Sequence, residues 1–206
     1  ALHRLLRLQQ DDQLAASRGV IAFSSGNFGQ ALAAAATTLG IKCTIVSPHD
    51  APSVKLERIR HYGATLRTSV ADYTTGENRE VVAAALAMRL SQEHGLTLLH
   101  PFDDVDVIHG QGTIGLEFLA QADSLLGIAG GANGSSSGSG SGLDALVVPA
   151  GGGGMAAGIC LSVETHYGGR SQKGAISGIR TLPQVVTVEP PGYDDHAHSF
   201  ASPGKQ

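Results

Sequence analysis

The stretch "AFSSGNFGQALAAAATTLG", residues Ala22–Gly40, decides the fold class of this chain. An apolar run ends at Phe23 and an alanine-rich helical pattern begins near Phe28, so the residues "SSGN" between them join a strand to a helix. Serine and asparagine are favoured N-caps, and one of them would satisfy the helix end. Two serines, a glycine and an asparagine exceed what a cap requires. The turn is therefore also a candidate for binding an anion with its backbone amides.

The same alternation continues along the chain. Short β-branched runs alternate with alanine-rich helical patterns, which is typical of βαβ units on a mostly parallel sheet. The sequence therefore predicts an α/β fold. The expected strands are 20–23, 43–46, 65–67, 96–99, 145–148 and 185–188. The expected helices are one at the N-terminus and those at 29–38, 53–61, 78–93, 107–120 and 155–164.

The amino-acid composition limits the kinds of molecule that the chain is expected to bind. The chain has 206 residues, 42% of them hydrophobic and 16% charged, which favours a soluble globular protein over disorder. The net charge is -4 and the sequence has no Lys/Arg-rich run. It therefore lacks the basic patch that proteins binding nucleic acids or acidic membranes usually have. The two cysteines, Cys43 and Cys160, form neither a disulfide framework nor a metal motif, which favours a reducing compartment. We expect both in the core.

Two glycine-rich stretches have different expected structural roles. The segment 130–142, "GGANGSSSGSGSG", has the composition of a flexible insertion. By contrast, Gly151–Gly154 lie directly between an expected strand and an expected helix. There the backbone can approach a ligand closely and the amides of the helix N-terminus can converge on a phosphate. The alternative is a tight turn that needs glycine only for its backbone angles.

Three motifs carry a resemblance to a known family. In order, "SSGNFGQALAAAA", "HPFDDVDVIHGQGT" and "VVPAGGGGMAAGI" resemble the fold-type-II pyridoxal-phosphate enzymes, and most of all their serine racemase and serine/threonine dehydratase branch. The resemblance implies a two-domain, three-layer sandwich of the tryptophan-synthase-β-like type. It assigns 1–10 and 106–206 to a larger, incomplete domain and 11–105 to a smaller domain, with 130–142 as an insertion.

The resemblance also implies the binding residues. In such enzymes the S-S-G-N turn holds the substrate carboxylate, and its asparagine contacts the pyridoxal ring oxygen. The cofactor is pyridoxal 5'-phosphate, whose phosphate lies in the tetraglycine loop. The implied substrate-binding residues are Ser24, Ser25, Gly26, Asn27 and Phe28. The implied cofactor-binding residues are Asn27, Phe102, Gly151, Gly152, Gly153, Gly154 and Met155. Phe102 is equally well interpreted as an ordinary core aromatic.

The implied reaction is deamination of L-serine or L-threonine by β-elimination, giving a 2-keto acid and ammonia, with serine racemisation as a companion activity. Ser25 matches the racemase serine that handles a proton, so we expect it to act as acid or base. Phe28 stands where many relatives have histidine, and Phe102 stands where the racemase pattern often has asparagine and looks more like the dehydratases. On balance, these two departures favour elimination. A cysteine-synthase-like β-replacement enzyme is the alternative within the fold, although its loop usually has a T-S-G-N-T-G pattern.

The Schiff-base lysine of the family is missing from the chain. Lys42, Lys55, Lys173 and Lys205 lack its context, whereas Ala1-Leu2 would match the end of the segment that carries it. We therefore expect that lysine a few residues before Ala1, and the chain alone to be inactive. A lysine-lacking binding homologue is the alternative.

A cation site and the remaining properties follow from the same resemblance. Glu189, the Tyr193 carbonyl and Asp195 would be oxygen ligands of a structural or activating Mg²⁺ or Ca²⁺. We interpret Asp103, Asp104 and Asp106 as solvated loop carboxylates. We expect a cytoplasmic homodimer that acts on a small amino acid and binds neither nucleic acid nor membrane.

Overall fold

The computed structural model describes residues 1–12, 17–126, 143–168, 182–192, 198 and 201. It comprises two compact units, residues 1–110 and 111–206, and each unit is described by itself. No helix within the described ranges combines the length and the apolar character needed to cross a membrane.

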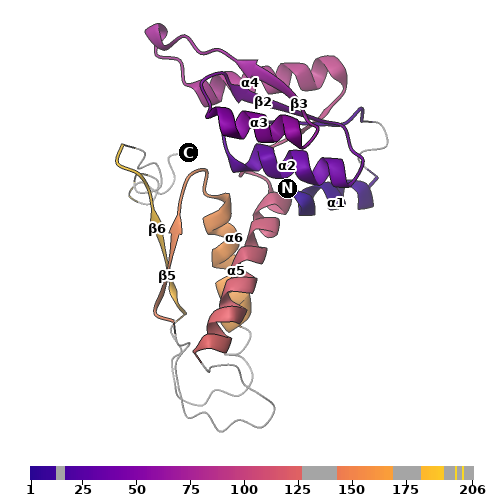
Figure 1. Ribbon diagram of the computed structural model, residues 1–206. Coiled ribbons are helices and arrows are strands. Elements are labelled where there is room, and N and C mark those ends of the chain that lie inside the picture. Colours follow the sequence, from indigo (N-terminus) through magenta and orange to yellow (C-terminus); the bar gives the residue numbers. More distant parts are fainter. Residues whose placement is uncertain (13–16, 127–142, 169–181, 193–197, 199–200, 202–206) are drawn as a thin grey trace. The chain divides into compact units, whose positions relative to one another are not determined.

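Unit 1 is built on four parallel strands, β1 (Val20–Phe23), β2 (Cys43–Pro48), β3 (Thr65–Ser69) and β4 (Thr97–Leu99). Their order in the sheet is β3-β2-β1-β4, and Figure 1 labels the neighbouring strands β2 and β3. In the central strand β1, Val20 lies opposite both Cys43 and Thr97. All four residues of β1 are buried, as expected for a strand covered on both faces.

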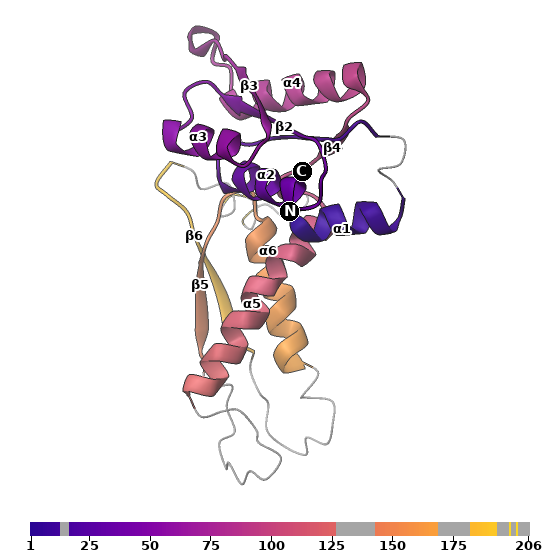
Figure 2. The same cartoon turned by 45° about the vertical axis from the view of Figure 1, so that its right-hand side comes forward.

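Helices cover both faces of this sheet: α1 (Leu2–Gln10), α2 (Asn27–Thr38), α3 (Ser53–His61) and α4 (Arg79–His94). In Figure 2, α4 lies on the opposite side of the strands from α2 and α3. One core joins α1, α2 and α3 to the sheet through residues such as Leu5, Leu32 and Ile59. A second core packs Ala83 and Ala87 of α4 against Ile21. Unit 1 is thus a three-layer α/β arrangement.

Unit 2 contains a parallel strand pair, β5 (Ala145–Pro149) and β6 (Gln184–Val188). The helix α6 (Gly154–Val163), a π-helical turn at Glu164–Gly168 and the C-terminal part of α5 (Val105–Leu125) accompany it. Leu146 and Val148 of β5 are buried and pack with Ile159 of α6 and Leu119 of α5. Alternate residues of β5 are exposed, so only one face of this pair is covered by the described residues.

Glycines let α5 and α6 approach closely. A Cβ on Gly115 would lie 2.7 Å from the Ser162 Cβ, and one on Gly112 would lie 3.0 Å from the Gly158 carbonyl oxygen. The Ser162 hydroxyl donates to the Gly112 carbonyl over 2.6 Å. The glycines of the "GQGTIG" segment therefore serve helix packing.

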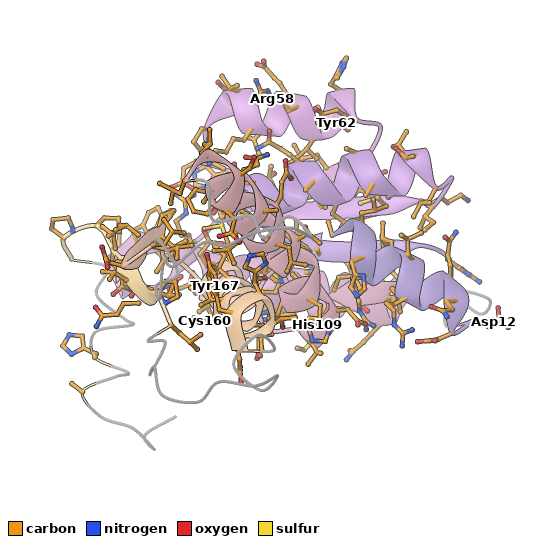
Figure 3. All side chains as sticks on the ribbon, turned by 90° about the horizontal axis from the view of Figure 1, so that it is seen from below. Asp12, Arg58, Tyr62, His109, Cys160 and Tyr167 are labelled. Atoms are coloured by element: carbon orange, nitrogen blue, oxygen red, sulfur yellow. The ribbon has the colours of Figure 1, made fainter. Side chains whose placement is uncertain are left out.

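The α/β class and every expected strand and helix are confirmed, with boundaries shifted by a few residues. A 3₁₀ turn at Tyr73–Thr75 and the π-helical turn were not expected. Cys43 is buried as expected, and its burial raises the pKa of the thiol to about 12. The expectation for Cys160 was wrong: this residue lies on the exposed side of α6 (Figure 3). The insertion 130–142 lies outside the described residues.

Candidate functional site

The turn after β1 is organised by Ser24. Its side chain is 7% exposed, and its hydroxyl accepts the amide protons of Gly26 over 3.2 Å and of Gly29 over 3.0 Å. Its own amide donates to the Val46 carbonyl of β2 over 2.9 Å. Ser24 therefore caps α2 from a position before the helix, with its hydroxyl oxygen and its backbone amide both engaged within unit 1.

The residues that follow Ser24 have hydrogen-bond donors that could bind a ligand. Among the described residues, no hydrogen-bond partner is present for the backbone amides of Ser25, Asn27 and Phe28, nor for the Ser25 hydroxyl. The first turn of α2 contains no acidic residue. Because helix N-termini carry partial positive charge, this turn is suited to an anion such as a carboxylate.

A lysine near the turn adds positive charge. The Lys55 ammonium of α3 lies 4.0 Å from the position that a Cβ would take on Gly26. The position of Lys55 next to the turn depends on the packing of α3 against α2, which no local sequence signal specifies.

The end of β4 lies beside the end of β1 because these strands pair in parallel, with Ala22 opposite Leu99. The His100 ring there packs edge-on against Phe23, with 5.2 Å between ring centroids, and against Phe102, with 4.6 Å. The Asp103 amide donates to His100 Nδ1 over 2.9 Å. His100 is therefore a structural support, whereas Phe102 is 39% exposed and is not an ordinary core residue.

Arg79, at the start of α4, is held by a carboxylate. Its guanidinium lies 2.9 Å from Asp50, which follows β2, and the Tyr73 hydroxyl donates to the same carboxylate over 2.7 Å. The hydrogen bond from Tyr73 is the main cause that lowers the pKa of Asp50, and Arg79 adds to the effect. This cluster closes the loop between β3 and α4 onto the end of β2.

In unit 2, the glycine loop joins β5 to α6. Gly151 and Gly152 are exposed, and a Cβ on Gly151 would meet open space. Gly153 has φ +79°, a value that favours glycine, and α6 begins at the next residue. No side chain caps α6, its first turn has no acidic residue, and the amides of Gly154 and Met155 have no partner among the described residues. This helix end offers uncapped donors to an anion.

The expected cation ligands are described only in part. Glu189 follows β6 and is half-buried. Tyr193 and Asp195 lie outside the described residues, so this site stays a prediction.

The acidic segment before α5 corrects the sequence interpretation. Asp104 is an N-cap, because its carboxylate accepts the amide protons of Asp106 and Val107 over 2.9 and 3.1 Å. Arg4 of α1 forms ion pairs with Asp104 at 2.9 Å and with Asp106 at 2.8 Å. These two carboxylates are only 16% and 20% exposed and are not solvated loop groups. The D-x-D spacing was the available signal, but the sequence does not reveal the arginine partner.

Comparison with known proteins identifies the family. A family model described as "Pyridoxal-phosphate dependent enzyme" matches residues 1–205. The chain belongs to this family. Among curated members, it is 34% identical to the serine racemase of Dictyostelium discoideum over 191 residues, covering 93% of this chain and 47% of that protein. It is 39% identical to the mitochondrial threonine dehydratase of Schizosaccharomyces pombe over 153 residues, covering 74% of this chain and 22% of that protein.

A family member of known structure has the same fold. A pyridoxal 5'-phosphate-dependent aspartate racemase superposes with a TM-score of 0.71 at 29% identity, covering 99% of this chain and 51% of that one. The fold is therefore that of the fold-type-II pyridoxal-phosphate enzymes. The chain spans about half the length, or less, of the curated relatives named above.

Proposed function

We propose that this chain is part of an enzyme that deaminates L-serine or L-threonine. The β-hydroxyl leaves as water, and one water is then consumed as the dehydrated product is hydrolysed, so that the net products are a 2-keto acid and ammonia. Serine racemisation is a companion activity in this proposal. The observation that carries it is the turn after β1. There Ser24 fixes the loop while the amides of Ser25, Asn27 and Phe28 remain available beside Lys55.

The glycine loop fits the cofactor's phosphate. It offers uncapped amides at a helix N-terminus, no side chain in the way at Gly151 and no carboxylate in the first turn. Gly151–Gly154 and Met155 would hold that phosphate. Pyridoxal phosphate, when bound, supplies an acceptor for the electron pair left at the α-carbon. Asn27 and Phe102 complete the proposed cofactor contacts.

The chain's own residues bind and orient the substrate. The three available amides after Ser24 hold the carboxylate, and the Lys55 ammonium strengthens that interaction. Ser24 shapes this loop. Ser25 holds or receives a proton through its hydroxyl Oγ. An unperturbed serine hydroxyl is a weak base, so this role depends on the charge close to it.

The direct test is incubation of the full-length protein with L-serine and with L-threonine. Pyruvate and 2-oxobutyrate, each with ammonia, are the expected products. A β-replacement enzyme would release no keto acid from either substrate and would instead need an added nucleophile. Ser25→Ala should abolish racemisation; racemisation at the wild-type rate in this variant would remove Ser25 from the mechanism.

We propose that the full-length protein carries the lysine to which this family's chemistry attaches pyridoxal phosphate covalently. Borohydride reduction of the protein with pyridoxal phosphate, followed by peptide mapping, should find the cofactor fixed to that lysine. Cofactor that washes away after reduction would instead favour a binding homologue without catalysis.

We also propose a bound divalent cation, a division of the chain into two domains and a homodimeric assembly. Mg²⁺ or Ca²⁺ bound by Glu189, Tyr193 and Asp195 should raise the melting temperature. Residues 1–10 and 106–206 belong to a larger domain in this proposal, and 11–105 to a smaller one. A cytoplasmic homodimer is the proposed state, and light scattering of the full-length protein tests the dimer.

A further inference from the structure

Three side chains of unit 1 that the proposed reaction does not use lie together at the surface. His3 is on α1, and Asp106 and His109 lie three residues apart on the first turns of α5, a spacing that puts two side chains on one helix face. One ligand atom from each residue lies within 4.8 Å of the other two. Within the described residues, no other group of three His, Cys, Asp or Glu side chains meets this criterion.

The backbone brings these residues together. A Cβ on Gly110 would lie 3.1 Å from the Cβ of His3, so the missing side chain of Gly110 lets α1 approach α5 closely. The His3 and His109 rings consequently lie 6.3 Å apart between centroids, in an edge-on arrangement. His109 is exposed (Figure 3), and about two-fifths of the His3 side chain is exposed, so both rings can rotate.

Arg4 orients the carboxylate. Its guanidinium is 2.8 Å from Asp106 Oδ2, whereas Asp106 Oδ1 lies 3.8 Å from His3 Nε2. Metal-binding carboxylates commonly have one such outer partner, which fixes their orientation. With Oδ2 engaged by Arg4, Oδ1 faces His3, and Arg7 Nε lies at the same distance of 3.8 Å from Oδ1.

We propose that His3, Asp106 and His109 bind a divalent transition metal of the zinc type. Two imidazoles and one carboxylate suit Zn²⁺ and disfavour Mg²⁺ and Ca²⁺, which prefer all-oxygen ligands. Donor atoms around tetrahedral zinc are roughly 3.3 Å apart at bond lengths near 2.0 Å, so small rotations of the exposed rings close the site. Water fills the fourth position.

Nearby charges set the strength of the site. Arg4 and Arg7 both approach Asp106, the latter at 3.8 Å, and they oppose a bound cation, whereas Asp104 partly offsets them. With this balance and the exposure of the histidines, binding is weaker than at a buried structural zinc site. The metal joins α1 to α5 by coordination, in addition to the ion pairs of Arg4.

Titration of the full-length protein, prepared without an affinity tag, with ZnCl₂ tests the proposal. Calorimetry should detect a site that His3→Ala or His109→Ala weakens at least about tenfold. The double variant, which leaves Asp106 as the sole remaining ligand of the three, should bind zinc more weakly than either single variant. His94→Ala, which removes an exposed histidine of α4, is the matched control and should leave the titration unchanged. MgCl₂ in excess should not displace the zinc.

A second measurement needs no variant. Zinc should protect His3 and His109, but not His94, from carbethoxylation by diethyl pyrocarbonate, as read by peptide mapping. Zinc binding that is equal in the wild type and both single variants would overturn the proposal. Equal modification of His3 and His109 with and without zinc would overturn it as well.

Discussion

Two neighbouring serines, Ser24 and Ser25, have different environments. Ser24 is buried and accepts two amide protons, while the Ser25 hydroxyl has no partner among the described residues. Replacement of Ser24 by alanine removes the acceptor for the Gly29 amide at the start of α2. We expect Ser24→Ala to lower the free energy of unfolding by roughly 1–2 kcal/mol. Ser25→Ala should leave it within about 0.5 kcal/mol of the wild type. Urea denaturation of the cofactor-free protein measures both; a larger loss in Ser25→Ala would contradict this division of roles.

The charge of Lys55 can be tested separately from the loop. At about 4 Å in water-like surroundings, an ammonium and a carboxylate attract by about 1 kcal/mol, which corresponds to roughly fivefold in affinity. We expect Lys55→Met to raise KM for L-serine about fivefold with a smaller effect on kcat. Lys42→Met removes the same charge from an exposed position outside the turn and is the control. Equal KM values in both variants would show that Lys55 does not contribute.

At the element scale, the start of α5 combines a cap with an ion pair. Asp104 accepts two amide protons and also pairs with Arg4. Asparagine caps helices about as well as aspartate but carries no charge. We expect Asp104→Ala to lower the free energy of unfolding by about 1–2 kcal/mol, and Asp104→Asn by less than about 1 kcal/mol. Thermal unfolding of the two variants separates these contributions. A loss in Asp104→Asn as large as in Asp104→Ala would assign the whole effect to the ion pair.

The glycine loop before α6 contains positions with different requirements. Gly153 has φ +79°, where a Cβ costs roughly 1–2 kcal/mol, whereas Gly151 has ordinary φ and open space at its Cβ position. We therefore expect Gly153→Ala to destabilise the cofactor-free protein by that amount and Gly151→Ala to leave its stability unchanged or slightly raised. Chemical denaturation measures both. Equal stabilities of the two variants would mean that the loop relieves the strain at Gly153.

The sequence predicts elements better than contacts between them. Every strand and α-helix of the described residues was predicted, because hydrophobic periodicity and turn residues are local signals. The turn Ser24–Asn27 was recognised for the same reason. The contact from Lys55 to that turn, the Arg4–Asp104 ion pair and the exposure of Cys160 were not predicted. Each depends on which faces of distant helices pack together, and a residue's neighbours in the chain do not specify this.

At the scale of the whole molecule, the two units differ in how completely they are covered. Within the described residues, the sheet of unit 1 has helices on both faces, whereas β5 and β6 of unit 2 expose large apolar residues such as Val147 and Val188. Two-stranded sheets are marginally stable by themselves. We therefore infer that unit 1 is the more independently stable part of the chain.

The two cysteines lie in different units, so their rates of chemical modification can be measured for each unit separately. Cys43 lies in the core of unit 1 and Cys160 is exposed in unit 2. The buried Cys43 thiol has its pKa raised to about 12, so at pH 8 only about one molecule in 10⁴ carries the reactive thiolate. We expect iodoacetamide to modify Cys160 of the native protein rapidly and Cys43 only when unit 1 opens. Peptide mapping by mass spectrometry distinguishes the two sites, and Cys43 modified as fast as Cys160 would contradict the burial.

The same thiol makes the stability of unit 1 depend on pH. Burial favours the neutral thiol in the folded protein, while an unfolded cysteine ionises near pH 8.5. The folded state therefore binds more protons between about pH 8.5 and 12, and the stabilisation present below pH 8.5 is lost as the pH rises through this range. We expect the free energy of unfolding to fall by at most about 1.4 kcal/mol per pH unit from this group. The Cys43→Ala variant lacks this thiol. Between pH 8 and pH 10, the free energy of unfolding measured by urea denaturation should therefore fall more in the wild type than in the variant. A constant difference would mean that the folded thiol ionises normally.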